Sequence, residues 1–195
     1  MTQPLASVEA ALAGGCRWLQ YRDKTAALEQ QVERAGQLSR LCRRYGAVFI
    51  INDNTGLALQ VEADGVHLGR DDGDLSAARQ ALSAGKILGA SCYNELQRAK
   101  RAVTEADYLA FGSVFASHIK PNAVRADLSL FVQARDLGPT LCAIGGITPN
   151  NVAALIAAGV KLVAVSSALF GRPEEPGLDA VQIEARAAAF CRLFQ

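Results

Sequence analysis

The sequence predicts an α/β fold built on a parallel sheet. Short apolar runs rich in β-branched residues alternate along the chain with amphipathic segments at helical spacing, a pattern typical of parallel strands joined by helices. We count seven such runs, each followed by a helical segment, with one more helical segment ahead of them all. Right-handed crossovers and this repeat length favour a TIM (β/α)8 barrel over an open sheet. We therefore expect a TIM barrel that lacks its first β-strand at the N-terminus.

The expected strands are brief apolar runs bounded by turn-forming or charged residues. They cover residues 18–22, 48–52, 65–68, 87–91, 108–112, 141–144 and 162–165. The expected helices cover residues 5–13, 28–44, 55–61, 74–84, 94–104, 129–136 and 179–194, with another that opens at residues 148–149. Capping residues support several of these bounds. Gly14-Gly15 and Gly46 follow two helices, Asn94 can cap a third, and Thr148-Pro149 has the order of an N-cap and a first-turn proline.

Composition and charge restrict the kind of protein this can be. The chain has 195 residues, 50% hydrophobic and 20% charged, with a net charge of +1. These values suit a single domain over residues 1–195 and give no sign of a nucleic-acid or membrane partner. We expect neither a signal peptide nor a membrane span. Five dispersed cysteines, odd in number and without metal-type spacing, favour reduced thiols in a cytoplasmic protein. The oligomeric state stays open, including a homo-oligomer.

Two aspartates stand directly after consecutive strands. Asp53 follows the run at residues 48–52, and Asp72 follows the run at residues 65–68. Parallel strands joined by a helix place their carboxyl ends on one rim, so both carboxylates would share that rim. Mg²⁺ takes one or two carboxylates plus substrate phosphates, which makes a Mg²⁺–diphosphate site the first hypothesis. Two solvated loop aspartates would produce the same pattern.

Polar residues occupy the other strand ends. Arg22 and Lys24 share one face of an extended segment and could hold an anion together, although a solvated strand end would look the same. His67 fits either a buried structural histidine or one that faces substrate. Gly145-Gly146 would let backbone approach a ligand closely, or only serve a tight turn. The remaining candidates are Ser91, Ser117, His118, Lys120, Ser166 and Ser167. Taken together, these strand ends favour a phosphorylated small-molecule substrate.

An ordered set of short motifs resembles the thiamine phosphate synthase family over about residues 5–170. The set comprises Gln20-Tyr21-Arg22-Asp23-Lys24, Ile51-Asn52-Asp53, Gly65-Val66-His67-Leu68-Gly69 with Asp72, Gly89-Ala90-Ser91, Phe111-Gly112 with Lys120, and Ala143-Ile144-Gly145-Gly146-Ile147. The resemblance implies a transferase of thiamine biosynthesis that joins hydroxymethylpyrimidine diphosphate to a thiazole phosphate, or to its carboxylated form, and releases diphosphate. It also implies a dissociative mechanism, in which diphosphate departs and the thiazole nitrogen attacks the resulting pyrimidinylmethyl cation.

The resemblance further implies roles for the matching residues. Mg²⁺ would be the cofactor, held by Asp53 and Asp72. Arg22, Lys24 and Lys120 would be catalytic, because their charges stabilise the departing diphosphate. The substrate-binding residues would be Gln20, Tyr21, Arg22, Asp23, Lys24, Asn52, His67, Ser91, Ser117, His118, Ile119, Lys120, Gly146, Ser166 and Ser167.

Three departures from the family pattern qualify this expectation. The family has a strand ahead of the first helix, for which we find no counterpart. Its usual Thr-x-Thr-Lys loop reads Ser117-His118-Ile119-Lys120 here, so Ile119 cannot supply the second hydroxyl, and Ser166 stands where an aliphatic residue is usual. The alternatives are a thiazole tautomerase-like isomerase, which does not need the diphosphate and Mg²⁺ residues, and a non-catalytic barrel that binds a thiamine precursor.

Overall fold

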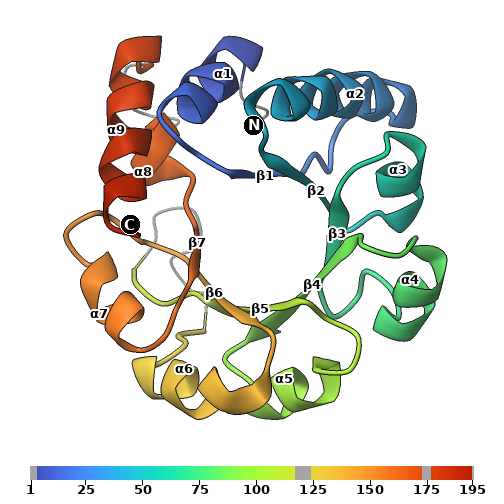
Figure 1. The fold of residues 1–195 in the computed structure, drawn as a ribbon, viewed down its shortest axis with the longest axis vertical. Helices are drawn as coiled ribbons and strands as arrows, with labels where there is room; N and C mark the ends of the chain where they lie inside the picture. Colours follow the sequence, from blue (N-terminus) through green and yellow to red (C-terminus); the bar gives the residue numbers. More distant parts are fainter. Residues whose placement is uncertain (1–3, 117–123, 173–176, 195) are drawn as a thin grey trace.

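A computed structural model describes residues 4–116, 124–172 and 177–194 of the chain. Its centre is a sheet of seven strands, each paired in parallel with the next along the chain. The strands are β1 (Trp18–Tyr21), β2 (Val48–Asn52), β3 (Gly65–Leu68), β4 (Ile87–Tyr93), β5 (Tyr108–Gly112), β6 (Thr140–Ile144) and β7 (Leu162–Ala164). Figure 1 shows this sheet curled into an incomplete ring. The expected TIM-like fold with seven strands is confirmed.

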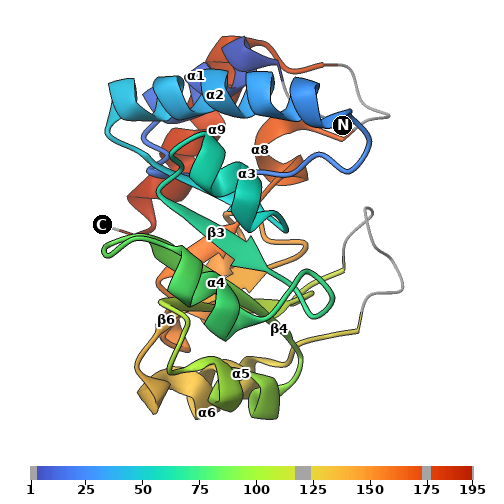
Figure 2. The same ribbon diagram turned by 90° about the vertical axis from the view of Figure 1, so that its right-hand side faces the viewer.

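The helices form a layer outside the ring. They are α1 (Leu5–Ala13), α2 (Leu28–Tyr45), α3 (Thr55–Gln60), α4 (Leu75–Ala81), α5 (Leu96–Ala102), α6 (Leu128–Ala134), α7 (Val152–Ala157), α8 (Ser167–Phe170) and α9 (Ala180–Arg192), with a 3₁₀ turn at Arg135–Leu137. Figure 2 shows α2, α3, α4 and α5 following one another around the sheet. Within the described residues, none of these helices is both long enough and apolar enough to cross a membrane.

The main core lies between the sheet and the helices. Side chains alternate between the two faces of a strand, and on β2 the outward-facing Phe49 and Ile51 pack in one cluster with Leu57 of α3. A second outer cluster covers β4 to β6, where Phe111 meets Phe131 of α6 with ring centroids 5.4 Å apart. The apolar residues of the strands therefore bury themselves against the helices, and the inward face is left for other side chains.

A smaller cluster fills the inside of the ring. Tyr108, Ala110 and Cys142 form it, with Leu162 and Ala164 of β7 packed against it. Gly89 of β4 makes room for the tyrosine, because a Cβ there would lie 2.1 Å from the Tyr108 ring. The interior is thus packed near its centre, as in other barrels of this type.

The ring is open between β1 and β7, which do not pair with each other in the described part of the chain. Several side chains along this opening are only partly buried: Trp18 is 37% exposed, and all three residues of β7 are half-buried. α1, α8 and α9 lie outside the opening (Figure 1). α1 and α9 touch closely, since a Cβ on Gly14 would lie 2.4 Å from the carbonyl oxygen of Glu184. Helix packing covers the side of the ring that strand pairing leaves open.

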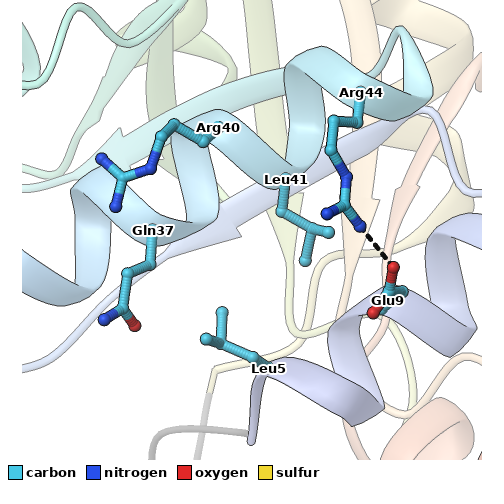
Figure 3. A pocket seen from close by; sticks show the side chains of 6 residues that line it. All are labelled: Leu5, Glu9, Gln37, Arg40, Leu41 and Arg44. Carbon is cyan, nitrogen blue, oxygen red and sulfur yellow. Dashed lines mark hydrogen bonds and ion pairs between the residues drawn. The ribbon is translucent and has the colours of Figure 1, made fainter.

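Polar contacts fix α1 to α2 next to this opening. Figure 3 shows Arg44 of α2 in an ion pair with Glu9 of α1. The Tyr45 hydroxyl donates a second hydrogen bond to the same carboxylate at 3.2 Å. A shallow pocket between the two helices is lined by these and neighbouring side chains, Leu5, Glu9, Gln37, Arg40, Leu41 and Arg44. It lies in the helical layer, away from the strand ends.

Two aspartates brace neighbouring strands at the amino end of the ring. The Asp64 carboxylate accepts a hydrogen bond from the backbone N–H of Phe49 in β2, and its carbonyl accepts one from Ile87 in β4, both at 2.8 Å. Asp107 repeats this arrangement, because its carboxylate accepts from the N–H of Leu88 at 2.8 Å and its carbonyl from the first residue of β6 at 2.9 Å. Each aspartate thus ties together the strands on either side of its own.

Two helix starts differ from those the sequence predicted. α5 begins at residue 96 rather than at Asn94, because β4 continues to Tyr93. α7 begins at Val152 rather than at Thr148-Pro149. There the Asn151 side chain accepts a hydrogen bond from the Thr148 N–H at 2.8 Å, which stabilises a separate turn ahead of the helix.

The bracing role of Asp64 predicts a stability loss that is independent of the active site. Replacing Asp64 with alanine leaves the Phe49 N–H without its acceptor, so we expect the free energy of unfolding to fall by about 1–3 kcal/mol. Urea denaturation followed by circular dichroism would measure this change. Asp136→Ala is the matched control, since Asp136 is exposed and should shift the free energy by less than about 0.5 kcal/mol. Equal effects of both substitutions would contradict the bracing role.

Candidate active site

Asp53 and Asp72 come together at the carboxyl rim. Asp53 directly follows β2, and its carboxyl shares a hydrogen bond with that of Asp72 from the loop after β3. The Asp53 N–H donates to the carbonyl of His67 at 2.9 Å, and its φ of +68° lies in the left-handed region, which aspartate enters more readily than most residues. The Asp72 carboxylate accepts from the N–H of Gly69 at 2.9 Å. Backbone contacts therefore hold both carboxylates in place before any ligand binds.

Two cations stand beside this carboxylate pair. Lys24 Nζ lies 3.1 Å from Asp53 Oδ2, and Arg22 Nε lies 3.7 Å from the same oxygen. Their side chains are 58% and 50% exposed, whereas that of Asp53 is 23% exposed. Such exposed ion pairs contribute little to stability. Both cations are consequently available to turn toward an anion that arrives at the rim.

The pKa values of the two carboxyl groups shift in opposite directions. Burial raises the pKa of Asp53, but hydrogen bonds with Asp72 and Lys24 and the charges of Lys24 and Arg22 outweigh it and hold the pKa below its ordinary value. Burial and the neighbouring Asp53 together raise the pKa of Asp72. Opposite shifts of this kind are expected for two carboxyl groups placed close together. A cation held between them would relieve the repulsion of their charges.

Deeper in the ring, polar and aromatic side chains form a connected group. His67 Nε2 lies 2.8 Å from Ser91 Oγ, and the imidazole stacks on the Tyr108 ring with centroids 5.4 Å apart. Gln20 Nε2 donates to the Tyr108 hydroxyl at 3.5 Å, and Trp18 packs edge-on against the Tyr108 ring. The structure thus brings together Gln20, His67 and Ser91, all predicted site residues. Tyr108 links them and was missed, because an aromatic residue in an apolar strand gives no polar signal.

Two buried polar atoms in this region have no partner among the described residues. They are Nδ1 of His67 and Nδ2 of Asn52. The two residues lie opposite each other on paired strands and so share a face of the sheet. Because buried polar atoms normally find partners, this pair of atoms indicates a position for a polar ligand group or a water molecule.

Tyr21 and Asp23 point the other way. Successive side chains of an extended segment alternate, so Gln20 and Arg22 face the site while Tyr21 and Asp23 face the helices. Tyr21 is 4% exposed and lies in the outer core, and Asp23 pairs with Arg34 of α2 at 2.9 Å. Both side chains are thus directed away from the rim, and their expected contact with substrate stays a prediction that this placement does not support. They anchor the end of β1 to α2 instead.

Farther along the rim, Gly145-Gly146 follow β6 and Ser166-Ser167 follow β7. The φ values of the glycines, +104° and +64°, lie in the left-handed region. A Cβ on Gly146 would lie 2.3 Å from the carbonyl oxygen of Ala116. The glycines therefore make room for the loop after β5, which the sequence alone did not reveal. Ser166 is exposed and Ser167 opens α8, so both lie where a rim ligand could reach them.

The remaining predicted residues lie outside the described part of the chain. They are Ser117, His118, Ile119 and Lys120, and their roles stay predictions. Within residues 4–116, 124–172 and 177–194, no group of three or more His, Cys, Asp or Glu side chains is arranged to hold a metal ion. Among these residues, Asp53 and Asp72 are the carboxylates placed together at the rim.

Comparison with known proteins identifies the family. A family model described as thiamine monophosphate synthase matches residues 2–169. The chain belongs to this family. The thiamine-phosphate synthase of Methylobacillus flagellatus is 52% identical over 187 residues, which cover 95% of this chain and 86% of the relative. That of Aromatoleum aromaticum is 52% identical over 195 residues, which cover 99% and 90%.

A solved structure supports the same assignment. The thiamine phosphate pyrophosphorylase from Pyrococcus furiosus matches with a TM-score of 0.85 at 31% identity, covering 98% of this chain and 90% of that chain. The resemblance drawn from short motifs is therefore confirmed. The thiamine monophosphate synthase match includes every rim position described above, from Gln20 after the first helix to Ser167 at the start of α8.

The burial of His67 predicts how stability depends on pH. Burial lowers the pKa of His67 from 6.5 to about 4, and the charge of Asp53 offsets only part of this effect. Between these values the unfolded chain binds the proton and the folded chain does not. Stability should therefore fall as the pH drops from 6.5 to 4, by about 3 kcal/mol for this group.

His67→Gln tests this dependence, because glutamine can keep a hydrogen bond to Ser91 without the acidic titration. Urea denaturation of both proteins at pH 7 and at pH 4 would give the free energies of unfolding. We expect wild type to lose more stability than the variant over this interval. Parallel losses would show that another group controls the acid transition.

Proposed function

We propose that this protein is a thiamine-phosphate synthase, a transferase that joins hydroxymethylpyrimidine diphosphate to a thiazole phosphate and releases diphosphate. One observation carries the proposal: a hydrogen-bonded carboxylate pair, Asp53 and Asp72, lies at the rim with Arg22 and Lys24 beside it. Acidic metal ligands next to mobile cations suit a diphosphate leaving group. Relatives at 52% identity carry the same name.

Mg²⁺ is the proposed cofactor, and the chemistry of the carboxylate pair fits it. Mg²⁺ prefers oxygen ligands and usually binds one or two carboxylates, with water and substrate phosphates completing its shell. Asp53 and Asp72 lie together at the rim, and the raised pKa of Asp72 reflects their mutual repulsion, which a divalent cation would relieve. When bound, Mg²⁺ would neutralise charge that develops on the diphosphate oxygens.

The protein's own cations would act on the same leaving group. Arg22 can contact two phosphate oxygens at once through its planar guanidinium, whereas Lys24 supplies a compact charge. Both approach Asp53 in the absence of substrate, so the diphosphate and the carboxylate would share their hydrogen bonds. We expect Lys120 to join them. The charge that these groups stabilise grows as the carbon–oxygen bond breaks, and their effect is therefore largest in the transition state.

The pyrimidine would lie deeper, against Gln20, Asn52, His67 and Ser91. The unpartnered Asn52 Nδ2 and His67 Nδ1 offer hydrogen bonds to polar atoms of that ring. We place the thiazole phosphate at Ser117, Gly146, Ser166 and Ser167. A dissociative reaction requires no protein nucleophile, since the ring nitrogen of the thiazole attacks the cation left by diphosphate departure. The task of the protein is to hold both substrates in line and to stabilise the leaving group.

A coupling assay tests the proposal directly. Purified protein is incubated with both phosphorylated precursors and Mg²⁺, and thiamine phosphate is measured as its fluorescent thiochrome derivative. We expect product that disappears when EDTA removes the metal. Asp72→Asn should reduce kcat/KM by at least about 100-fold, because it removes a charge that positions the cation.

Asp71→Asn is the matched control for that substitution. Asp71 is the exposed neighbour of Asp72 on the same loop, and its neutralisation should change kcat/KM by less than about threefold. No product from folded wild-type protein would reject the synthase and favour the tautomerase-like isomerase. Activity that persists in EDTA would reject Mg²⁺ as the cofactor but not the synthase activity.

A further inference from the structure

Two half-buried thiols lie where α1 packs against α9. Cys16 follows the end of α1, and Cys191 lies in the last turn of α9. The Cys16 thiol lies near that of Cys191, which helps to raise its pKa. The other three cysteines, Cys42, Cys92 and Cys142, are buried in the sheet and its outer layer, with exposures of 0%, 0% and 6%. Cys16 and Cys191 are thus set apart by contact with each other and by access to solvent.

The backbone around this thiol pair is held rigidly. α1 ends in a Schellman motif, in which the Gly15 N–H donates to the Leu12 carbonyl at 3.0 Å and the Cys16 N–H donates to the Ala11 carbonyl at 3.1 Å. Gly15 has a φ of +103°, and a Cβ there would lie 3.4 Å from Cys191 Sγ. α9 therefore runs directly against this turn. The backbone that carries Cys16 therefore lies within reach of the Cys191 sulfur, and a disulfide forms only between cysteines held this close.

The thiol pair lies beside the open side of the barrel. β1 and β7 do not pair with each other in the described structure, and α1 and α9 cover the opening between them (Figure 1). Cys16 precedes β1, so it lies at the amino end of the ring, opposite the rim that carries Asp53. A covalent bond here would join the two helices that close the barrel without entering the proposed active site.

We propose that Cys16 and Cys191 form a disulfide that fastens α1 to α9 when the protein meets a thiol oxidant. Each thiol gives up one proton, a bond forms between the two sulfur atoms, and two electrons pass to the oxidant. With glutathione disulfide, the oxidant is reduced to two glutathione thiols through a mixed disulfide on one of the cysteines. The two thiols together lose two electrons, and thioredoxin-type reductants would reverse the step.

Burial and the neighbouring Cys191 raise the pKa of the Cys16 thiol to about 11. At neutral pH this thiol is therefore protonated and a weak nucleophile. We therefore expect the bond to form slowly and to need prolonged exposure to the oxidant. The disulfide would close a loop that contains almost the whole chain, which strongly restricts the unfolded state.

The experiment compares reduced protein with protein treated with glutathione disulfide. Intact mass spectrometry and peptide mapping under non-reducing conditions would locate any new bond, and free thiols would be counted with Ellman's reagent. We expect two thiols to be lost, a peptide that joins Cys16 to Cys191, and a thermal midpoint raised by roughly 5–15 °C. The coupling activity should stay within about twofold of that of the reduced protein, since the bond lies away from the rim.

Cys16→Ser and Cys191→Ser are the matched variants. Each should lose the rise in thermal midpoint on oxidation while keeping a reduced-state midpoint close to that of wild type. Peptide mapping of the wild-type protein decides the question even where a variant folds poorly. Five free thiols after oxidation, a bond between other cysteines, or a Cys16–Cys191 bond with no change in the midpoint would each overturn the proposal.

Discussion

Parallel pairing of successive strands is the constraint on which the rest of this molecule depends. It brings seven carboxyl ends to one rim, and the register decides which side chains face each other there. Asn52 stands opposite His67, and His67 opposite Gly89. Because side chains alternate along a strand, a slip of one residue would exchange the inward set for the outward set. Asp64 and Asp107 oppose such slips, since each binds backbone groups of two other strands at the amino end.

The opening between β1 and β7 makes the neighbourhood of β1 a special case. β1 has a paired strand on one side only, yet Arg22 and Lys24 follow it and must be placed against Asp53. The ion pair of Asp23 with Arg34 supplies part of the missing support, because it ties the end of β1 to α2. α2 is in turn joined to α1 by Arg44 and Glu9. Contacts in the helical layer thus support the end of β1, after which these two cations lie beside Asp53.

The sequence was sufficient for the fold and for most of the rim. The apolar runs at β2, β3 and β5 end where the predicted strands end, since buried parallel strands give a strong local signal. Asp53 and Asp72 could be placed on one rim from strand order alone. The alternation of side chains that groups Arg22 with Lys24 also directs Tyr21 and Asp23 to the opposite face, toward the helices. The resemblance to the family motif instead treats the five residues from Gln20 to Lys24 as one substrate-binding unit.

Other features needed tertiary information. Tyr108 connects Gln20 to His67 through an interior that no local pattern describes. The role of Gly146 depends on the loop after β5. The start of α7 depends on a turn that the Asn151 side chain stabilises, although Thr148-Pro149 has the sequence of a helix N-terminus. The paired thiols of Cys16 and Cys191 are separated by nearly the whole chain. Each of these relations joins residues that only the folded sheet brings together, so propensity and spacing could not reveal them.

The carboxylate pair shows how the rim is prepared for its proposed chemistry. Two like charges placed close together are unfavourable. Lys24 and Arg22 help to hold the pKa of Asp53 below its ordinary value, whereas burial and the neighbouring Asp53 raise the pKa of Asp72. A divalent cation held by both carboxylates would relieve their repulsion. Lys24 and Arg22, which now lie beside Asp53, would then be able to contact an incoming diphosphate. Loading of the metal and binding of the anion would in this way favour each other, through groups that the strand order has already placed side by side.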